Sequence, residues 1–191
     1  MDRARVLERR RAFRGRIIEV SVDRVVLPSG VEAVREVVRH PGAAAVVPVL
    51  PDGRILLVEQ YRYAADGTLL EIPAGTLDAG ETPRACAGRE LEEETGYRAA
   101  RWRRLASFFA APGTLDEVIT VFLALGLKRG RRALDDEEDG LALRAMSLER
   151  ALAAVRRGRV RDGKSIVGLL LARDEIRGMG RGAPPAASRR R

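Results

Sequence analysis

Four glutamates crowd a short stretch of this sequence, the run RELEEE at residues 89–94. On a helix, Glu90 and Glu94 would lie four residues apart on one face, where like charges repel. Arg89 can pair with Glu93 at the same spacing, which leaves Glu90 and Glu94 uncompensated. Residues whose local arrangement is unfavourable by itself, such as two like charges on one helix face, are typical of a functional site. The partner that would balance these carboxylates is a cation.

The other metal-ligating residue types narrow the choice of cation. The sequence has one histidine, His40, and one cysteine, Cys86, so a multi-histidine zinc site and an intrachain disulfide are both excluded. Carboxylate oxygens without nitrogen or sulfur ligands favour a hard ion, Mg²⁺ or Mn²⁺. Taken alone, the same run could also be the solvent-exposed acidic end of a helix.

The residues around the run predict the helix that carries it. Thr82 can cap a helix start, and Pro83 fits the first turn, where its missing N–H has no intrahelical partner. Gly96 is typical of the position that follows a helix end. We therefore expect a helix over residues 83–95, preceded by a turn-rich loop at residues 75–81.

The loop and the helix together form a longer pattern, GTLDAGETPRACAGRELEEETGY at residues 75–97. Its Gly75, its Glu81, the REL-x-EE-x-G run and the bulky Tyr97 match every defined position of the Nudix box. The chain therefore resembles a Nudix hydrolase. The resemblance implies an α+β fold, a Nudix-like α/β/α sandwich with a small N-terminal β region.

The resemblance also implies roles for individual residues of the box. Glu90 and Glu94 resemble metal ligands, with Glu93 as a further ligand or a helper that acts through water. The backbone carbonyl of Ala74 resembles another ligand, and Arg89 the residue that orients the glutamates. The implied cofactor is Mg²⁺, with Mn²⁺ as a possible substitute. Bound divalent ions neutralise charge on a pyrophosphate and activate water, which suits cleavage of a nucleoside diphosphate linked to another group.

Three further segments resemble the ADP-ribose pyrophosphatase branch of the family. The first is the pair Pro112-Gly113, whose proline lies 15 residues beyond Tyr97. The second is the combination of the runs EQYR at 59–62 and EIPAG at 71–75. The third is the stretch REVVRHPGAA at residues 35–44, ahead of the box. In that branch the N-terminal β region swaps across a homodimer and helps to bind the adenosine side. The implied reaction is hydrolysis of ADP-ribose to AMP and ribose 5-phosphate.

The branch resemblance implies substrate-binding residues outside the box. Arg35 and Arg62 would contact phosphate or ribose, Glu117 would help the terminal ribose or its loop, and Gly113 belongs to the same substrate-binding set. Arg62 could instead be a surface arginine of a strand, and the Pro112-Gly113 pair an ordinary turn.

The general base is expected in the acidic run at residues 135–139, before the last predicted strand. The family's usual acidic pair, two residues apart, best overlays Glu137 and Asp139. Glu137 is therefore the first candidate for the catalytic base, and Glu138 the second.

The rest of the sequence sets the domain organisation and the partners. The net charge of +8 lies in the two ends, because residues 17–176 have a slight excess of acid. We expect a basic segment at 1–15, a β region at 16–42 that can swap in a dimer, a Nudix domain at 43–176 and a flexible basic tail at 177–191. Such basic ends are most often solvated and disordered, and at most make nonspecific contacts with nucleic acid. Neither a secretory leader nor a membrane span is visible, so a cytoplasmic protein with a small-molecule substrate is expected.

Apolar alternation and turn residues predict the remaining elements. Strands are expected within 16–39 and over 44–50, 54–61, 69–72, 102–109, 118–125 and 141–146, a charged loop over 127–140, and helices over 147–157 and 165–176.

Three alternative functions remain open at this point. The first is a broader ADP-sugar or other nucleoside-diphosphate-sugar pyrophosphatase. The second is a noncatalytic nucleotide-binding regulator on the same fold, against which the intact box argues. The third, removal of oxidised nucleoside triphosphates, fits poorly with the long N-terminal β region and the proline spacing.

Overall fold

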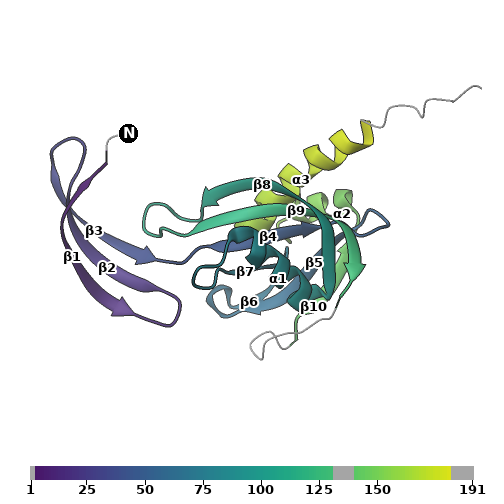
Figure 1. Ribbon diagram of the computed structural model, residues 1–191, viewed down its shortest axis with the longest axis horizontal. Coiled ribbons are helices and arrows are strands. Elements are labelled where there is room, and N and C mark those ends of the chain that lie inside the picture. Colours follow the sequence, from purple (N-terminus) through teal and green to yellow (C-terminus); the bar gives the residue numbers. More distant parts are fainter. Residues whose placement is uncertain (1–2, 131–139, 182–191) are drawn as a thin grey trace, which may run out of the picture.

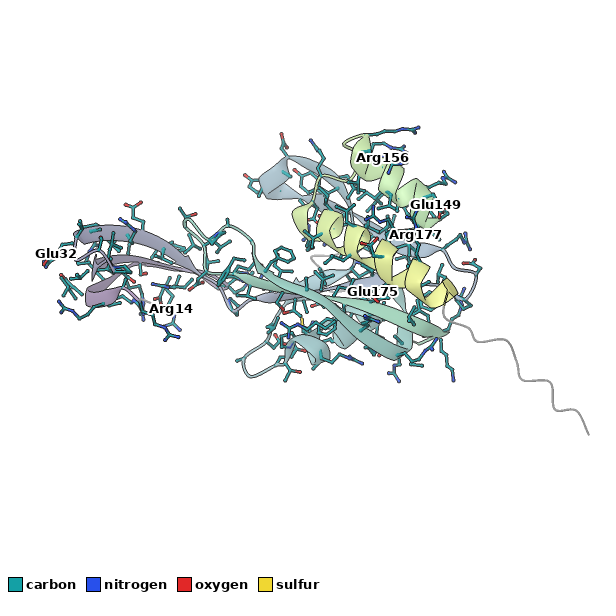
Figure 2. The ribbon with its side chains drawn as sticks, turned by 90° about the horizontal axis from the view of Figure 1, so that it is seen from above. Arg14, Glu32, Glu149, Arg156, Glu175 and Arg177 are labelled. Carbon is teal, nitrogen blue, oxygen red and sulfur yellow. The ribbon has the colours of Figure 1, made fainter. Side chains whose placement is uncertain are left out.

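The computed structural model describes residues 3–130 and 140–181. It contains a small N-terminal sheet that projects from a larger body of sheets and helices (Figure 1). The N-terminal sheet has the order β1-β2-β3 and is antiparallel. Its strands are β1 (Arg5–Arg14), β2 (Glu19–Val26) and β3 (Glu32–Arg39). In Figure 2, Arg14 and Glu32 mark this sheet at the end of the molecule opposite to helices α2 and α3.

Strand β1 corrects one expectation, because the basic N-terminal segment was expected to be disordered. All ten residues of β1 are exposed, but the strand pairs with β2 along its length. The Arg9 Nε atom lies 3.1 Å from Asp23 Oδ2, and Arg39 Nη2 lies 2.6 Å from the same oxygen. Asp23 is only 3% exposed, so these arginines supply the charge that its burial requires. The ordered β region therefore begins ahead of residue 16.

The body contains two sheets. The first has the order β7-β4-β9-β8, and the second the order β10-β5-β6. Strand β4 pairs with β9 in parallel, and the remaining neighbours in both sheets are antiparallel. The strands are β4 (Ala43–Pro48), β5 (Ile55–Arg62), β6 (Gly67–Glu71), β7 (Ala74–Thr76), β8 (Tyr97–Phe109), β9 (Val118–Arg129) and β10 (Ala142–Met146), and a 3-10 turn, η1 (Tyr63–Ala65), links β5 to β6.

Strand β4 lies at the centre of the sandwich because both of its faces are apolar. Ala43, Ala45 and Val47 pack into a cluster that includes residues of α2 (Leu148–Arg156) and α3 (Gly163–Arg181). Ala44 and Val46 pack into a second cluster with residues of α1 (Pro83–Thr95). Helices therefore cover both faces of the sheet, which confirms the expected α/β/α sandwich.

Most helix and strand boundaries agree with the sequence, and α1 covers the residues expected. Strands β8 and β9 are the clearest exceptions: β8 begins at Tyr97, where a strand was expected only from residue 102, and β9 runs to Arg129, where a loop was expected from residue 127. Leu127 is buried and pairs with Ala99 of β8, so a partner distant in sequence extends the strand. Within the described ranges, no helix is long and apolar enough to cross a membrane.

The projecting sheet is attached to the body next to the β8–β9 connection. Val38 of β3 forms a parallel bridge with Leu115. Arg39 Nη1 donates to Asp116 Oδ2 at 3.1 Å, and the backbone N–H of His40 donates to Asp116 Oδ1 at 2.9 Å. These contacts place Glu117, the next residue, where β9 enters the sandwich.

Candidate active site

Helix α1 begins and ends where its capping residues dictate. The Thr82 side chain accepts a hydrogen bond from the backbone N–H of Ala85 at 3.2 Å. Gly96 ends the helix with a φ of 72°, in the left-handed region that glycine adopts without strain. Between these caps, Glu90 and Glu94 share the buried face of the helix, with exposed fractions of 7% and 1%. The structure thus excludes a solvent-exposed acidic helix end for these two residues.

Arg89 is the hub of the loop and helix. Its Nε and Nη2 atoms donate to the two carboxylate oxygens of Glu81 at 3.0 and 2.9 Å. Its Nη1 atom donates to Glu90 Oε1 at 2.6 Å and to Glu93 Oε2 at 3.1 Å. The hydrogen bond to Glu81, together with these two glutamates, raises the pKa of Arg89 above its ordinary value. Arg89 therefore compensates Glu90 as well as Glu93, which corrects the expectation that Glu90 lacks a partner.

Glu81 fastens the loop to the helix. Its carboxylate also accepts the backbone N–H of Asp78 at 3.1 Å. The hydrogen bonds from Arg89 hold the pKa of Glu81 below its ordinary value. Cys86, on the same helix, is buried, and its thiol donates to the backbone carbonyl of Gly75 at 3.5 Å. Burial, followed by the charges of Glu90 and Glu81, raises the pKa of this thiol to about 12, so Cys86 packs the loop and is no nucleophile.

The three glutamates expected to hold metal line one cavity. Glu90, Glu93 and Glu94 border about 330 Å³ of open space beside strand β7. Its remaining lining residues come from the end of β5 and η1, from β7 and from α1: Gln60, Tyr61, Arg62, Tyr63, Ala74, Gly75, Thr76 and Arg89. The structure thus brings the acidic helix and the expected carbonyl ligand, Ala74, to one site.

A second cavity, of about 390 Å³, adjoins the first. Arg62 and the strand Ala74–Thr76 line both, so the two form parts of one cleft. The second part adds Glu117 from the start of β9 and Lys164 from the start of α3. Carboxylates therefore dominate one part of the cleft, and Arg62 and Lys164 supply positive charge beside the other.

The donor atoms around the first cavity fit a hard divalent ion. The three glutamates offer carboxylate oxygens, and the Gln60 Oε1 atom is buried there without a hydrogen bond within the described residues. In the described ranges, no three His, Cys, Asp or Glu side chains are gathered closely enough to hold an ion as they stand. Arg89 contacts Oε1 of Glu90 and Oε2 of Glu93, so an ion at this site would share these two carboxylates with the guanidinium group.

The structure separates the expected substrate-binding residues into two groups. Arg62 and Glu117 line the cleft, as expected. Arg35 is exposed on β3 and donates to the backbone carbonyl of Val34, and it lines neither part of the cleft. Gly113 lines a separate cavity of about 190 Å³ in the β8–β9 connection. Within one chain, the structure therefore does not bring Arg35 or Gly113 to the box. Glu137 and Glu138 lie outside the described residues.

Sequence reasoning missed Gln60, Asp162 and Lys164, all of which line the cleft. Gln60 lies in the EQYR run that carries the branch resemblance, and this was the available signal. Lys164 is one of only two lysines in the chain, but nothing local points to its role. Its partner Glu71 is 93 residues away in sequence.

A larger cavity of about 480 Å³ lies elsewhere, between the β10-β5-β6 sheet and α2. Of the described residues, four arginines and one carboxylate line it, and the carboxylate, Glu59, is paired with Arg144 at 2.6 Å. This lining shares no residue with the box and offers no set of oxygen ligands for a divalent ion. The cleft beside the box is therefore the site where hydrolytic chemistry is possible.

Known proteins show the same fold and the same motif. The NUDIX domain profile matches residues 38–166. The methanol dehydrogenase activator of Bacillus methanolicus is 42% identical over 156 residues, covering 81% of this chain and 84% of that protein. The ADP-ribose pyrophosphatase of Bacillus subtilis strain 168 is 40% identical over 163 residues, covering 84% of this chain and 88% of that protein. The crystal structure of an ADP compounds hydrolase, at 22% identity, covers 95% of this chain and 98% of that chain with a TM-score of 0.82, which shows the shared fold. With its box, its sandwich and these relatives, the chain belongs to the Nudix family and is a Nudix hydrolase.

Proposed function

We propose that this protein hydrolyses ADP-ribose to AMP and ribose 5-phosphate in the presence of Mg²⁺, which Mn²⁺ can replace. One structural observation carries the proposal. The cleft combines buried glutamates of α1 in one part with Arg62, Glu117 and Lys164 in the adjoining part. A metal-dependent hydrolase needs the first part, and a phosphorylated sugar needs the cations and hydrogen-bonding groups of the second. The 40% identity to an ADP-ribose pyrophosphatase selects the substrate.

Glu90, Glu94 and the carbonyl of Ala74 would hold the ion, with Glu93 as a further ligand or a contact through water. When bound, Mg²⁺ neutralises charge on the pyrophosphate and lowers the pKa of water. Arg89 positions the glutamates through the bonds already described. Because its Nη1 atom donates to both Glu90 and Glu93, the guanidinium group fixes where these two carboxylates lie beside the cavity.

The remaining residues bind substrate and move a proton. Arg62 is oriented by a two-pronged hydrogen bond to Glu71 and would bind a phosphate oxygen. Glu117 would accept a hydrogen bond from a hydroxyl group of the terminal ribose. A water oxygen forms a new bond to one phosphorus as the bond from that phosphorus to the bridging oxygen breaks. The water's proton passes to a general base, Glu137 or, as the second candidate, Glu138.

The projecting sheet supports a homodimer as part of the proposal. Outside the body it exposes large apolar side chains, which in a monomer would contact water. They include Val6, Leu7, Phe13, Val31 and Val34. Exchange of this sheet between two chains would cover them and would bring Arg35 of the partner subunit to the cleft, which explains why Arg35 is remote from the box within one chain. We place the protein in the cytoplasm, where its single, buried cysteine stays reduced.

A substrate panel tests the proposal. The purified protein is incubated with ADP-ribose, ADP-glucose, GDP-mannose, NADH and diadenosine polyphosphates, with Mg²⁺ or Mn²⁺, and the products are identified by mass. We expect ADP-ribose to give the highest kcat/KM and to release AMP and ribose 5-phosphate. A higher kcat/KM for another sugar nucleotide would show that the assigned substrate is wrong, while the assigned reaction, hydrolysis of a pyrophosphate bond, would stand. Tight binding without cleavage of any substrate would favour a regulator, as the likeness to a dehydrogenase activator suggests.

Two pairs of variants test the residue assignments. Glu94→Gln should reduce kcat by ~10³-fold or more, because it removes a charged ligand. Glu92→Gln is its matched control, since Glu92 lies on the same helix, pairs with Arg98 at 2.6 Å and does not line the cleft. Near wild-type turnover of Glu94→Gln would remove the metal assignment. Glu137→Gln should also lose most of the activity. A larger loss of activity in Glu138→Gln would instead identify Glu138 as the general base.

A further inference from the structure

Glu71, at the end of β6, is a buried carboxylate held by two cations from different parts of the chain. It is 1% exposed. Arg62 donates to both of its oxygens, from Nε to Oε1 at 3.0 Å and from Nη2 to Oε2 at 2.9 Å. Lys164 Nζ donates to the same Oε2 atom at 2.6 Å. The Arg62 Nη1 atom takes no part in these bonds and is therefore the donor available to a ligand in the cleft.

Both cations favour the ionised form of Glu71 where it lies. Burial opposes its charge, yet the hydrogen bond from Arg62 and the charge of Lys164 hold its pKa below the ordinary value. The hydrogen bond that Arg62 donates to Glu71 in turn raises the pKa of Arg62. Glu71 is the buried member of this group, so moving either cation away would reduce the compensation of its charge and favour a change of geometry.

Lys164 is itself fixed by the start of α3. Its Nζ atom lies 3.0 Å from Asp162 Oδ1, and its side chain is 13% exposed. Asp162 accepts the backbone N–H of Ser165 at 2.9 Å, and Ser165 Oγ accepts the backbone N–H of Ile72 at 2.8 Å. The first turn of α3 is therefore bonded to two adjacent residues, Glu71 at the end of β6 and Ile72 after it. Farther along α3, Glu175, which is labelled in Figure 2, accepts from Arg103 Nη1 of β8 at 2.8 Å, and this ion pair holds the helix against that strand.

We propose that Lys164 is a positioning residue: its ammonium group holds the Glu71 carboxylate from the side of α3, so that Arg62 keeps the orientation in which it binds a phosphate of the substrate. The inference rests on the proposed function for the role of Arg62. A small misplacement of a substrate-binding group is costly for catalysis, so a lysine whose ammonium group pairs with Glu71 and Asp162 can still control turnover. Lys164 and Arg62 line the same part of the cleft, so the effect is local.

Four proteins test the inference: the wild type, Lys164→Met, Arg62→Gln and the double variant. We expect Lys164→Met to lower kcat/KM by ~10-fold or more. If Lys164 acts through Arg62, adding Lys164→Met to Arg62→Gln should lower kcat/KM by less than about twofold, because the group to be positioned is already absent. Multiplication of the two single effects in the double variant, or an unchanged kcat/KM in Lys164→Met, would overturn the proposal.

Two further variants separate positioning from a general loss of structure. Lys164→Arg keeps the charge and should recover most of the kcat/KM lost in Lys164→Met. Lys128→Met replaces the only other lysine, which is exposed on β9, and should stay within about twofold of the wild type. If Lys164→Met does not fold, Lys164→Gln in the wild-type and Arg62→Gln backgrounds carries the same comparison, because it also removes the charge. A failure of Lys164→Arg to recover activity despite a wild-type melting temperature would also count against positioning.

The design keeps this inference distinct from the proposed function. Activity of the wild type alone decides the reaction and its substrate. The coupling between residues 62 and 164 is measured on whichever panel substrate the wild type cleaves best. If the wild type cleaves none, the same four proteins are compared by calorimetry for their Kd for ADP-ribose, with the same non-multiplicative result expected.

Discussion

Gly75 lies so close to the Glu90 carboxylate that a Cβ at residue 75 would be 1.8 Å from Glu90 Oε1. Only a hydrogen fits between the backbone of β7 and this side chain. The φ of Gly75 is not in the left-handed region, so close approach, not backbone conformation, explains the glycine. The box therefore begins with a glycine because the Glu90 carboxylate occupies the space that a side chain at residue 75 would need.

Gly75→Ala should displace the Glu90 carboxylate and lower both activity and stability. We expect kcat to fall by ~10²-fold, because a ligand group moves, and the free energy of unfolding to fall by about 1–3 kcal/mol from overpacking. The measurements are steady-state kinetics and urea unfolding. Gly67→Ala is the matched control, since a Cβ there would meet nothing nearer than 3.9 Å. Equal behaviour of the two variants would contradict the steric role of Gly75.

Arg89→Gln should destabilise the protein most when divalent ions are absent. The substitution leaves Glu81, Glu90 and Glu93 without their shared cation, at a cost of about 1–3 kcal/mol. Added Mg²⁺ should raise the melting temperature of this variant more than that of the wild type, because the ion takes over part of the compensation. Differential scanning calorimetry with EDTA and with Mg²⁺ measures this difference. Arg84→Gln, on the same helix but stacked on Trp102 at 3.7 Å, should show no extra response to Mg²⁺.

The buried Glu71 predicts a loss of stability in acid. Its folded-state pKa lies below the ordinary 4.5, so the folded protein favours the ionised form. This contribution is complete above the unfolded-state pKa and disappears as the pH falls through the lower, folded-state pKa. Urea unfolding from neutral pH to about pH 3 should show the difference between the wild type and Glu71→Gln shrinking toward acid. A difference that stays constant with pH would show that Glu71 is not held ionised.

Cys86 should resist alkylation in the folded protein. Its pKa of about 12 leaves almost no thiolate near neutral pH, and its side chain is fully buried. Incubation with iodoacetamide at about pH 8 should leave the native protein unmodified, whereas the urea-unfolded protein should react completely. Rapid labelling of the native form, detected by mass spectrometry, would show that α1 opens easily from the loop before it.

The sequence alone was sufficient for features that depend on neighbouring residues. The helix at 83–95 follows from its own caps, Thr82 and Gly96, and the box is recognised because its spacing is local. The sandwich was expected from the resemblance that the box carries, and the apolar residues that β4 packs on both of its faces agree with it. Even there, local reasoning gave Arg89 too few partners, because its distances to Glu81 and Glu90 depend on how the loop folds back.

Only the tertiary structure decided which distant residues meet. Strand β1 forms because Asp23 and β2 pair with it, although its own basic sequence favours solvent. Strand β9 extends past residue 127 because β8 offers a partner there. Lys164 reaches Glu71 across 93 residues, and Arg35 and Gly113 stay away from the box within one chain. Hydrogen bonds and packing form between residues that are near in space. A sequence pattern reveals only those contacts whose residues are also near along the chain.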